Sequence, residues 1–503
     1  MFNNMLLKSI SISALALALA SGHAYSGDAV KNLPVESIDG SGRNIMRTVD
    51  GGLVSAYAVA NGSRKELVFS TSLDNGQHWN ATTINGTNGK VVQVAVDSNF
   101  EGSYLAFTEK ENRLSVGKVA FVSAPFADKP AIVVSQVITP PGVDASDTFI
   151  QASRRGWGNH SDESRQTIVY GWQDKNSKNL YVGVSTDGRT FPMASKVVED
   201  KFATSGPAVA IRGDDVIASY LTTNPAFAPV DVDQSTNSGR AYPAYIESLD
   251  GGRTWSKPKA LFGLKAADYP VVKVEFEPGK FEDLRLAGGT NQPNSPTLDW
   301  GSTRELGPRD VESDKSASTI DPSLDPNNGI NFVQTSMQAV DKEGRPIGEV
   351  GIVSFKAIKP PNAPWKHVVA NNKLSNSVKD LGASKPDVTT SYFQYSALIN
   401  TPIRATSYKE YDKTTGSARL VVAVSTDTGM NFEHHISFTP EELSRQGIKA
   451  FDEKAIFTSS QCLFEDRNGD VYLDVLVSQG IETHYARVPV GVNAGLYRVA
   501  GKM

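Results

Sequence analysis

An eight-residue stretch, Ser72-Leu73-Asp74-Asn75-Gly76-Gln77-His78-Trp79, decides how this chain folds. It directly follows a β-forming run, Leu67-Val68-Phe69, so a strand ends where the stretch begins. The Asp74 carboxylate can accept hydrogen bonds from backbone N–H groups of the turn, and Gly76 supplies a conformation with positive φ. Trp79 then folds back onto the neighbouring hairpin. The spacing therefore predicts a strand, a tight turn and an aromatic anchor.

The same stretch returns along the chain. Ser248 to Trp255 repeats it in full, Ser425 to Phe432 ends on phenylalanine, and Ser185 to Phe191 lacks one residue between Asp and Gly. Each copy follows a β-rich run, so we interpret the copies as structural hairpins that build the fold. Their structural residues are Ser72, Asp74, Gly76, Trp79, Asp187, Ser248, Asp250, Gly252, Trp255, Ser425, Asp427, Gly429 and Phe432.

The rest of the chain alternates between short apolar runs and turn residues. Val91 to Val96, Ile168 to Trp172 and Val471 to Val477 are typical strands, separated by Gly, Asn and Asp. Helical periodicity is scarce. The best helix candidate is Thr439 to Arg445, where a threonine cap precedes a proline at the first helical position.

The repeated stretch resembles the Asp box, or BNR repeat, of sialidases and related Asp-box propellers. This resemblance implies an all-β fold: a six-bladed β-propeller of four-stranded antiparallel sheets with Asp-box hairpins. Hairpins without a box, at 91–120, 331–357 and 456–486, fill the remaining blades. Radial closure leaves only short, protected sheet edges.

The N-terminus has the order of a secretory signal peptide. Lys8 precedes an apolar run from Ile10 to Ala20, and small residues end at Ala24. We therefore predict a signal peptide at 1–24 and a single propeller at 25–503. The run is too short for a stable membrane anchor, although an N-terminal membrane helix is the alternative. We therefore predict an exported bacterial protein that is periplasmic or extracellular. We predict no stable membrane span.

Charge and cysteine content narrow the partners. The formal net charge is −5 over 503 residues, and both signs are interspersed, which argues against nucleic acid. Glycans and cell-surface proteins remain as partners, and the sequence assigns no oligomeric state. Cys462 is the single cysteine, so no internal disulfide is possible and the fold depends on core burial.

Two stretches, 222–241 and 278–330, are rich in turn residues, and we predict long loops on one face. Such loops often carry recognition, although plain decoration is the alternative. The second stretch holds acidic residues whose oxygens suit calcium, but their spacing matches no defined loop. We therefore predict no cofactor and no metal site, with calcium left open. The acidic residues are Asp299, Asp310, Glu312, Asp314, Asp321 and Asp325.

The resemblance to sialidases implies catalytic residues at particular positions of the chain. It implies three arginines that grip a carboxylate, a tyrosine nucleophile paired with a glutamate, and an aspartate acid/base. Candidates exist only for some of these roles, and several are out of register. No aspartate lies between Gly51 and Leu73, and serines occupy 458–464, where the tyrosine is expected. The catalytic candidates are Arg43, Glu275, Arg285 and Arg419.

A second group combines charge with an aromatic ring and is a candidate for ligand binding, with a polar loop between blades as the alternative. It consists of Arg154, Arg155, Trp157 and His160. We therefore consider two functions. The first is a non-catalytic module that binds a glycan or a protein. The second is an exo-acting glycosidase with a non-standard site, which predicts a deep axial pocket with paired carboxylates.

Overall fold

The structure is a computed structural model of the chain. It describes residues 33–34, 43–48, 50–153, 166–204, 208–212, 214–231, 242–261, 263–265, 267, 271–277, 280–285, 297–299, 307–313, 330–336, 338–340, 352–358, 366–373, 394–398, 401–412, 417–427, 432, 434–449, 451–452, 454–460, 462–479 and 482–497.

Seven antiparallel sheets, called blades 1 to 7 here, follow one another along the described chain. Blade 1 is β2 (Ile45–Arg47), β3 (Leu53–Asn61), β4 (Arg64–Ser72) and β5 (Asn80–Thr83). Blade 2 is β6 (Val91–Asn99), β7 (Gly102–Glu111), β8 (Leu114–Ser123) and β9 (Ala131–Val134). Blade 3 is β10 (Ala145–Ala152), β11 (Ile168–Asp174), β12 (Leu180–Ser185) and β13 (Ser195–Val198). Blade 4 is β14 (Ala208–Arg212), β15 (Asp215–Thr222), β16 (Tyr242–Ser248) and β17 (Lys259–Ala260).

The second half of the chain adds three blades and two small sheets. Blade 5 is β21 (Gly307–Ser313), β22 (Ile330–Ser336), β24 (Ile352–Ile358) and β25 (Lys366–Lys373). Blade 6 is β26 (Gln394–Ala397), β27 (Arg404–Asp412), β28 (Ser417–Ser425) and β29 (His434–Phe438). Blade 7 is β30 (Ile456–Ser459), β31 (Phe464–Glu465), β32 (Asp470–Gln479) and β33 (Glu482–Asn493), joined by β1 (Leu33–Pro34). The small sheets pair β18 (Val271–Glu277) with β19 (Lys280–Arg285), and β20 (Thr297–Asp299) with β23 (Gln338–Val340).

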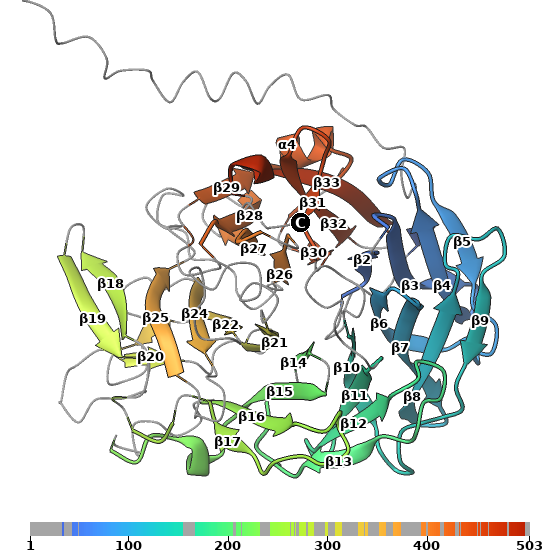
Figure 1. Cartoon of the computed structure of the whole chain (residues 1–503), viewed down its shortest axis with the longest axis horizontal. Helices are drawn as coiled ribbons and strands as arrows, with labels where there is room; N and C mark the ends of the chain where they lie inside the picture. Colours follow the sequence, from blue (N-terminus) through green and yellow to red (C-terminus); the bar gives the residue numbers. More distant parts are fainter. Residues whose placement is uncertain are drawn as a thin grey trace, which may run out of the picture.

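The innermost strands of the blades close a ring. Contacts run from β2 to β6, β10, β14, β21, β26 and β30, and from β30 back to β2. Figure 1 shows these strands around the centre, with the outer strands at the periphery. Because β1 pairs with β33, the N-terminal strand is joined to the last blade. The predicted all-β propeller of four-stranded antiparallel sheets is confirmed.

The ring has one blade more than the six predicted from the repeats. The difference arises because the stretch 278–330, interpreted as a loop, contains the strands β19, β20 and β21. β21 is the innermost strand of blade 5 and contacts both β14 and β26. Its Gly- and Pro-rich surroundings hide the strand, because such residues are depleted in strands.

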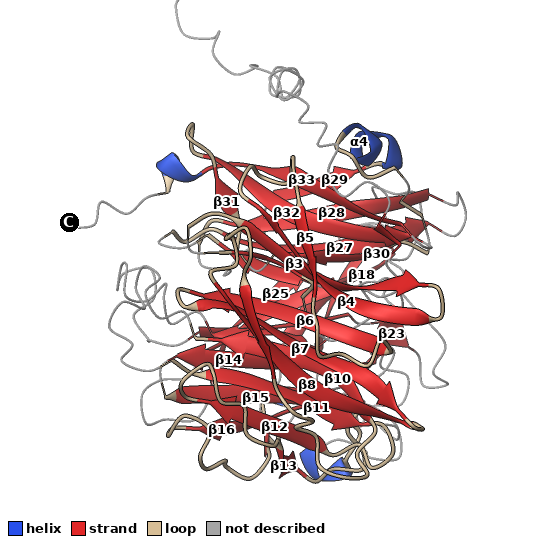
Figure 2. Cartoon of the chain, turned by 90° about the vertical axis from the view of Figure 1, so that its right-hand side faces the viewer, coloured by secondary structure: helices blue, strands red, loops and turns tan. Residues whose placement is uncertain are grey.

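Helices are short and lie at the edges of the molecule, as Figure 2 shows. They are α4 (Pro440–Arg445) and the 3-10 turns η3 (Pro225–Phe227) and η5 (Ala494–Leu496). The predicted helix start is confirmed, because Thr439 and Glu442 form a reciprocal capping box. Among the described residues, no helix has the length and apolar character needed to cross a bilayer.

Apolar clusters fill the spaces between adjacent blades. One cluster joins Met46 and Phe69 of blade 1 to Val94 and Phe107 of blade 2. Similar clusters join blades 2 and 3, blades 3 and 4, and blades 6 and 7. Each large apolar side chain buried in this way contributes about 1.5–3 kcal/mol. The core is therefore a series of layers between blades, as expected for a fold without disulfides.

The first Asp box forms a closed set of hydrogen bonds. Ser72 Oγ donates to Asp74 Oδ1 over 2.8 Å, and it accepts from the Gly76 N–H over 2.8 Å. The His78 N–H donates to Asp74 Oδ1 over 2.9 Å. Trp79 packs edge-on against Tyr485 of blade 7, with ring centroids 5.5 Å apart. The box therefore shapes its own turn and also anchors blade 1 to its neighbour.

The other copies form the same bonds where they are described. Ser248 Oγ donates to Asp250 Oδ1 over 2.8 Å, and Ser425 Oγ donates to Asp427 Oδ1 over 2.7 Å. In the shortened copy, the N–H groups of Arg189 and Thr190 donate to Asp187 Oδ1. Phe432 is buried, Trp255 is half-buried, and Gly429 lies outside the described residues.

Candidate functional site

Strand direction divides the propeller into two faces. Each Asp box connects the third and fourth strands of its blade, so all boxes lie on one side, called the box face here. Because strands alternate in direction, the connections between second and third strands and the links between blades lie on the opposite side, the loop face. The innermost strands begin at the loop face. The connection from β15 to β16 and the connection from β17 to β21 both begin at the loop face.

Three polar side chains lie where the first three innermost strands begin, and we call them the axial rim: Arg43, Gln93 and Asp147. Arg43 precedes β2, Gln93 is near the start of β6, and Asp147 is near the start of β10. All three are half-buried. Their order places a guanidinium, an amide and a carboxylate on consecutive innermost strands, with Arg43 opposite Val96, three residues closer to the box face than Gln93.

Hydrogen bonds hold the three rim strands side by side. The Val96 N–H of β6 donates to the Arg43 carbonyl over 2.7 Å. On the other side of β6, Thr148 Oγ1 of β10 donates to Gln93 Oε1 over 3.2 Å. The rim is therefore fixed by contacts between neighbouring blades, and its three residues come from segments far apart in the sequence.

The backbone at Asp147 is unusual for an innermost strand. Its φ is 50°, and the pairing of β10 with β11 shifts register between Ser146 and Phe149. An aspartate tolerates this left-handed conformation better than most residues, yet it still carries strain. A bulge of this kind re-aims a side chain and is over-represented beside functional sites. Asp147 is thus placed differently from a residue in a regular strand.

The rim suits recognition of a polar ligand. A guanidinium only donates hydrogen bonds, an ionised carboxylate only accepts them, and an amide does both. Bonds that involve the two charged groups are stronger than neutral ones. The three groups together match a ligand that carries both hydroxyl donors and oxygen acceptors.

A second innermost-strand carboxylate, Asp97, lies on β6 four residues closer to the box face than Gln93. Asp97 is 1% exposed, and its Oδ2 accepts from the Ala152 N–H over 2.7 Å. Ala152 is five residues beyond Asp147 on β10, so the two carboxylates are about 16 Å apart along the strand. Glycosidase carboxyl pairs are about 5–9.5 Å apart. Asp97 and Asp147 therefore do not form such a pair.

The segment where a sialidase nucleophile is expected is closed in the structure. Ser459 and Ser460 are fully buried at the end of β30. Ser459 Oγ is 3.1 Å from the Ser407 hydroxyl, and Ser460 Oγ donates to the Cys462 carbonyl over 2.6 Å. Both hydroxyls are engaged inside the protein, so neither is presented to a ligand.

Burial also shifts several tyrosines away from nucleophilic character. Burial raises the pKa of Tyr57 to about 12, against a hydrogen bond with Ser70 that lowers it. Burial likewise raises the pKa of Tyr245 to about 12. A nucleophile is activated by a lowered pKa or an adjacent base. The raised pKa values instead keep these two phenols protonated inside the packed blades.

The remaining predicted catalytic residues do not join the rim. Arg419 is half-buried on β28, the third strand of blade 6, about 10 Å outward from the innermost strand. Glu275 and Arg285 lie on the β18–β19 hairpin, opposite Phe281 and Val271 respectively. That hairpin is outside the blades, and its side chains are not described. Of the four candidates, Arg43 is the one that the described structure places at the axis.

The predicted binding cluster and the acidic loop are not positioned by the structure. Arg154, Arg155, Trp157 and His160 lie outside the described residues. Within the part that is described, no three His, Cys, Asp or Glu side chains gather as a metal site would require. Asp314, Asp321 and Asp325 also lie outside the described residues, and the side chains of Asp299, Asp310 and Glu312 are not described.

A buried ion pair holds the box-face end of β2. Arg47 Nε and Nη2 donate to the two carboxylate oxygens of Asp474 over 2.8 and 2.7 Å. Tyr485 Oη donates to the same carboxylate over 2.8 Å, and the guanidinium lies 4.1 Å from the Phe464 ring centroid. Burial lowers the pKa of Arg47, but the attraction of Asp474 outweighs it and the net pKa is raised. This pair joins blade 1 to blade 7.

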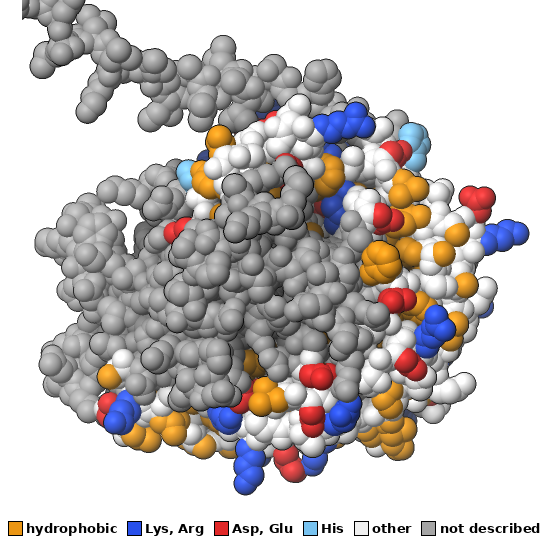
Figure 3. All heavy atoms as spheres, in the orientation of Figure 1, with side chains coloured by type: hydrophobic (Ala, Val, Ile, Leu, Met, Phe, Trp, Pro, Cys, Tyr) orange, Lys and Arg blue, Asp and Glu red, His pale blue; other side chains and the backbone are white. Residues whose placement is uncertain are grey.

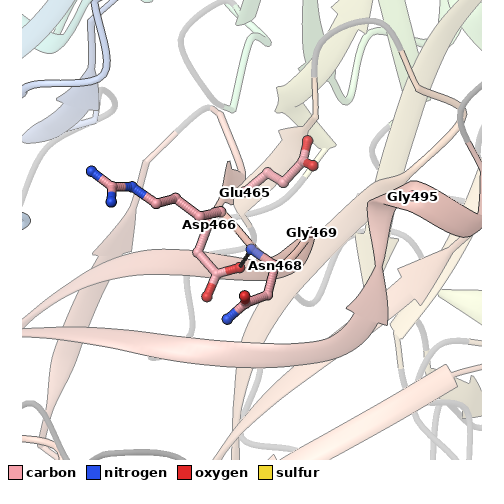
Figure 4. Close-up of a pocket in the computed structure, with 6 residues that line it drawn as sticks. Glu465, Asp466, Asn468, Gly469 and Gly495 are labelled. Atoms are coloured by element: carbon pink, nitrogen blue, oxygen red, sulfur yellow. Dashed lines mark hydrogen bonds between the residues drawn. The ribbon is translucent and has the colours of Figure 1, made fainter.

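A shallow depression on the box face lies beside blade 7. It is lined by the 465–469 turn and Gly495 (Figure 4). Asp466 Oδ1 accepts from the N–H groups of Asn468 and Asp470 over 2.9 and 3.0 Å. The Glu465 side chain points away from the Asp466 carboxylate. The Asp466 carboxylate is therefore occupied by its own turn.

The described surface carries no block of one charge on the face seen in Figure 3. Basic and acidic side chains are interspersed there, with apolar side chains between them.

Sequence comparisons give no match, either to a protein-family model or to a curated protein. Solved structures do match. An α-L-arabinanase of Penicillium chrysogenum is 12% identical, covers 79% of this chain and 97% of its own, and has a TM-score of 0.38. An α-L-arabinofuranosidase of Fusarium graminearum is 11% identical over 80% and 98%, with a TM-score of 0.38. A Trypanosoma rangeli sialidase is 11% identical over 92% and 57%, with a TM-score of 0.34. The chain is thus similar in structure to sialidases and arabinofuranosidases.

Proposed function

We propose that this chain is an exported, sialidase-like propeller that binds a glycan at the axial rim without cleaving it. The observation that carries this proposal is the placement of Arg43, Gln93 and Asp147 on three linked innermost strands of the ring. A glycan presents neighbouring hydroxyl groups that both donate and accept hydrogen bonds. Fixed polar groups on a rigid ring match such a ligand at low entropic cost.

The absence of cleavage is supported by two features of the described residues. The innermost-strand carboxylates Asp97 and Asp147 are too far apart to act as a pair. The serines at the expected nucleophile segment are buried and hydrogen-bonded internally. We therefore favour binding over hydrolysis.

One observation favours a second candidate, an exo-acting glycosidase with a non-standard site. Asp147 is held in a strained, bulged conformation at the start of an innermost strand. Strain of this kind clusters at active sites as well as at ligand clamps. This candidate requires turnover that depends on the Asp147 carboxylate, and a binding module does not.

The test uses the chain from residue 25 onward, a glycan array with neutral and acidic glycans, and calorimetry on the hits. We expect Arg43→Ala to weaken binding at least about tenfold, as expected for a central anchor. Arg64→Ala is the matched control, because Arg64 is a loop-face arginine on β4, away from the innermost strands. Its affinity should stay within about twofold of wild type.

The outcomes separate the candidates. Absence of any glycan ligand, or equal losses in the two arginine variants, would overturn the binding proposal. Aryl sialosides and aryl arabinofuranosides serve as turnover probes, and we expect no hydrolysis above background. Hydrolysis that disappears in Asp147→Asn would select the glycosidase instead.

Export is part of the proposal and has its own test. Expression of the full chain with its first 24 residues should yield a processed protein outside the cytoplasm. N-terminal sequencing should give a new terminus close to Ala24. An unprocessed, membrane-retained protein would favour the alternative of an N-terminal membrane helix.

A further inference from the structure

We infer that Asn44 is a positioning residue for the axial rim, an inference that rests on the proposed function. Asn44 lies between Arg43 and the start of β2 and is completely buried. Among the described residues near the rim, Asn44 is the one whose side chain donates hydrogen bonds both to β3 of blade 1 and to β6 of blade 2.

The Asn44 amide bridges two strands with its two protons. Nδ2 donates to the Ala56 carbonyl over 3.0 Å and to the Val94 carbonyl over 3.0 Å. The Oδ1 atom is buried without a hydrogen-bond partner among the described residues. The side chain therefore acts through its donors alone. A buried polar atom without a hydrogen-bond partner costs stability, so the two donated bonds are what Asn44 contributes at this position.

The backbone of Asn44 completes the attachment to blade 1. Its carbonyl accepts from the Ala56 N–H over 3.0 Å and from Ser55 Oγ over 2.8 Å. The preceding residue, Arg43, accepts from the Val96 N–H of blade 2. Both β3 and β6 thus hold the chain at the point from which the Arg43 side chain projects.

This attachment connects all three rim residues. Asn44 binds β6 at Val94, next to Gln93, and Gln93 contacts Thr148, next to Asp147. Loss of the Asn44 donors would remove one of the two attachments that hold this segment against β6, and it would leave the bond from the Val96 N–H to the Arg43 carbonyl without that support. The box-face end of β2 would stay in place, because the Arg47–Asp474 pair holds it independently. The expected effect is therefore local to the rim.

The test compares Asn44→Ala with Asn99→Ala. Asn99 is also a buried asparagine of the inner ring, but it ends β6 at the box face, where its Oδ1 accepts from the Glu101 N–H. The affinity for the glycan found on the array should fall between about tenfold and about a hundredfold in Asn44→Ala, the loss that a displacement of about 1 Å brings. Asn99→Ala should lower the melting temperature comparably and keep its affinity within about twofold of wild type.

Two further readouts keep the inference independent of folding and of the ligand. Asn44→Asp keeps the shape but lacks the donors, so it should lose affinity like Asn44→Ala. Hydrogen exchange of the Ala56 and Val96 N–H groups should accelerate in Asn44→Ala, while that of Ala152 stays unchanged. Equal affinity losses in Asn44→Ala and Asn99→Ala, or unchanged exchange at Val96, would overturn the inference. A wild-type protein that binds no glycan would instead overturn the proposed function, and the exchange result would still decide whether Asn44 fixes the rim.

Discussion

The two ends of the central axis differ in the burial and the pairing of their polar side chains. At the box face, Arg47 and Asp474 are buried, paired through two hydrogen bonds and covered by Phe464 and Tyr485. At the loop face, Arg43, Gln93 and Asp147 are half-buried, and one of them sits in a bulge. The comparison teaches that the box-face end is closed by a fully buried ion pair, whereas the loop-face half carries polar side chains that are only half-buried.

The largest expected effect concerns the box-face end. Asp474→Ala leaves the Arg47 guanidinium buried without its partner, so we expect a loss of about 3–5 kcal/mol in the free energy of unfolding. Urea denaturation of the variant and wild type measures it. Arg43→Ala should cost less than Asp474→Ala, because Arg43 is half-buried whereas Asp474 is fully buried and ion-paired.

A double variant separates the charge from the space it fills. Arg47→Met with Asp474→Leu removes both charges and keeps apolar volume, which is often neutral or stabilising. We expect it to recover most of the stability lost in Asp474→Ala. A single variant that loses less than about 1 kcal/mol, the range of exposed ion pairs, would contradict the closure role.

The next effect tests whether the box itself locks the ring. Gly76 has a φ of 82°, and a Cβ there would lie 2.1 Å from the Tyr485 ring of blade 7. Gly76→Ala combines left-handed strain with overpacking, so we expect a loss of about 3 kcal/mol in the free energy of unfolding. Thermal and urea unfolding measure the loss.

Gly51 provides the matched control for this prediction. It has a similar φ of 84°, but nothing lies within 4 Å of a Cβ built there. Gly51→Ala should therefore cost only the backbone strain, about 1–2 kcal/mol. Equal losses in the two variants would mean that the contact of the box with blade 7 adds nothing to stability.

The sequence predicts the box-face end better than the loop-face end, for a physical reason. A box consists of contacts within eight residues, so its hydrogen bonds follow from local spacing. The Arg47–Asp474 pair joins positions 427 residues apart, and no local pattern marks it. Blade 5 was missed because β21 lies in a stretch whose composition indicates a loop.

The rim shows the same limit on prediction from sequence. Arg43 could be predicted from its place before the first strand, through the family resemblance. Gln93 and Asp147 could not, because their nearness to Arg43 depends on how three blades pack side by side. The one local signal is that aspartate is enriched at positive φ, which a sequence does not reveal inside an expected strand.

A smaller effect separates stability from binding at the rim. Asp147→Gly removes a carboxylate from a position with a φ of 50°, where glycine is not strained. We expect stability to rise by about 0.5–1 kcal/mol while glycan affinity falls, the opposition typical of functional strain. Unfolding curves and calorimetry measure the two changes. Asn112→Gly is the control, because Asn112 has a φ of 54° in a loop-face turn of blade 2, away from the rim. If both variants gain stability and both keep their affinity, Asp147 is strained without a binding role.

The smallest expected effect is a pH dependence confined to the box face. Burial opposes ionisation of Asp187, but hydrogen bonds from Thr190 and Arg189 outweigh it and lower the pKa of Asp187 to about 2. Because the folded pKa lies below the ordinary value of 3.8, ionised Asp187 stabilises the fold above about pH 4, and this contribution is lost as the pH falls toward 2. Asp187→Asn should therefore lower the melting temperature at pH 7, and most of this difference from wild type should be gone at pH 2, close to the folded pKa. Asp128→Asn, in the blade 2 connection that has no box, should leave the melting temperature unchanged at both pH values. A difference between Asp187→Asn and wild type that persists at pH 2 would mean that the box is stabilised by the shape of its turn rather than by the carboxylate charge. The contrast between a buried, charge-paired end and a half-buried polar end would then rest on the Arg47–Asp474 pair alone.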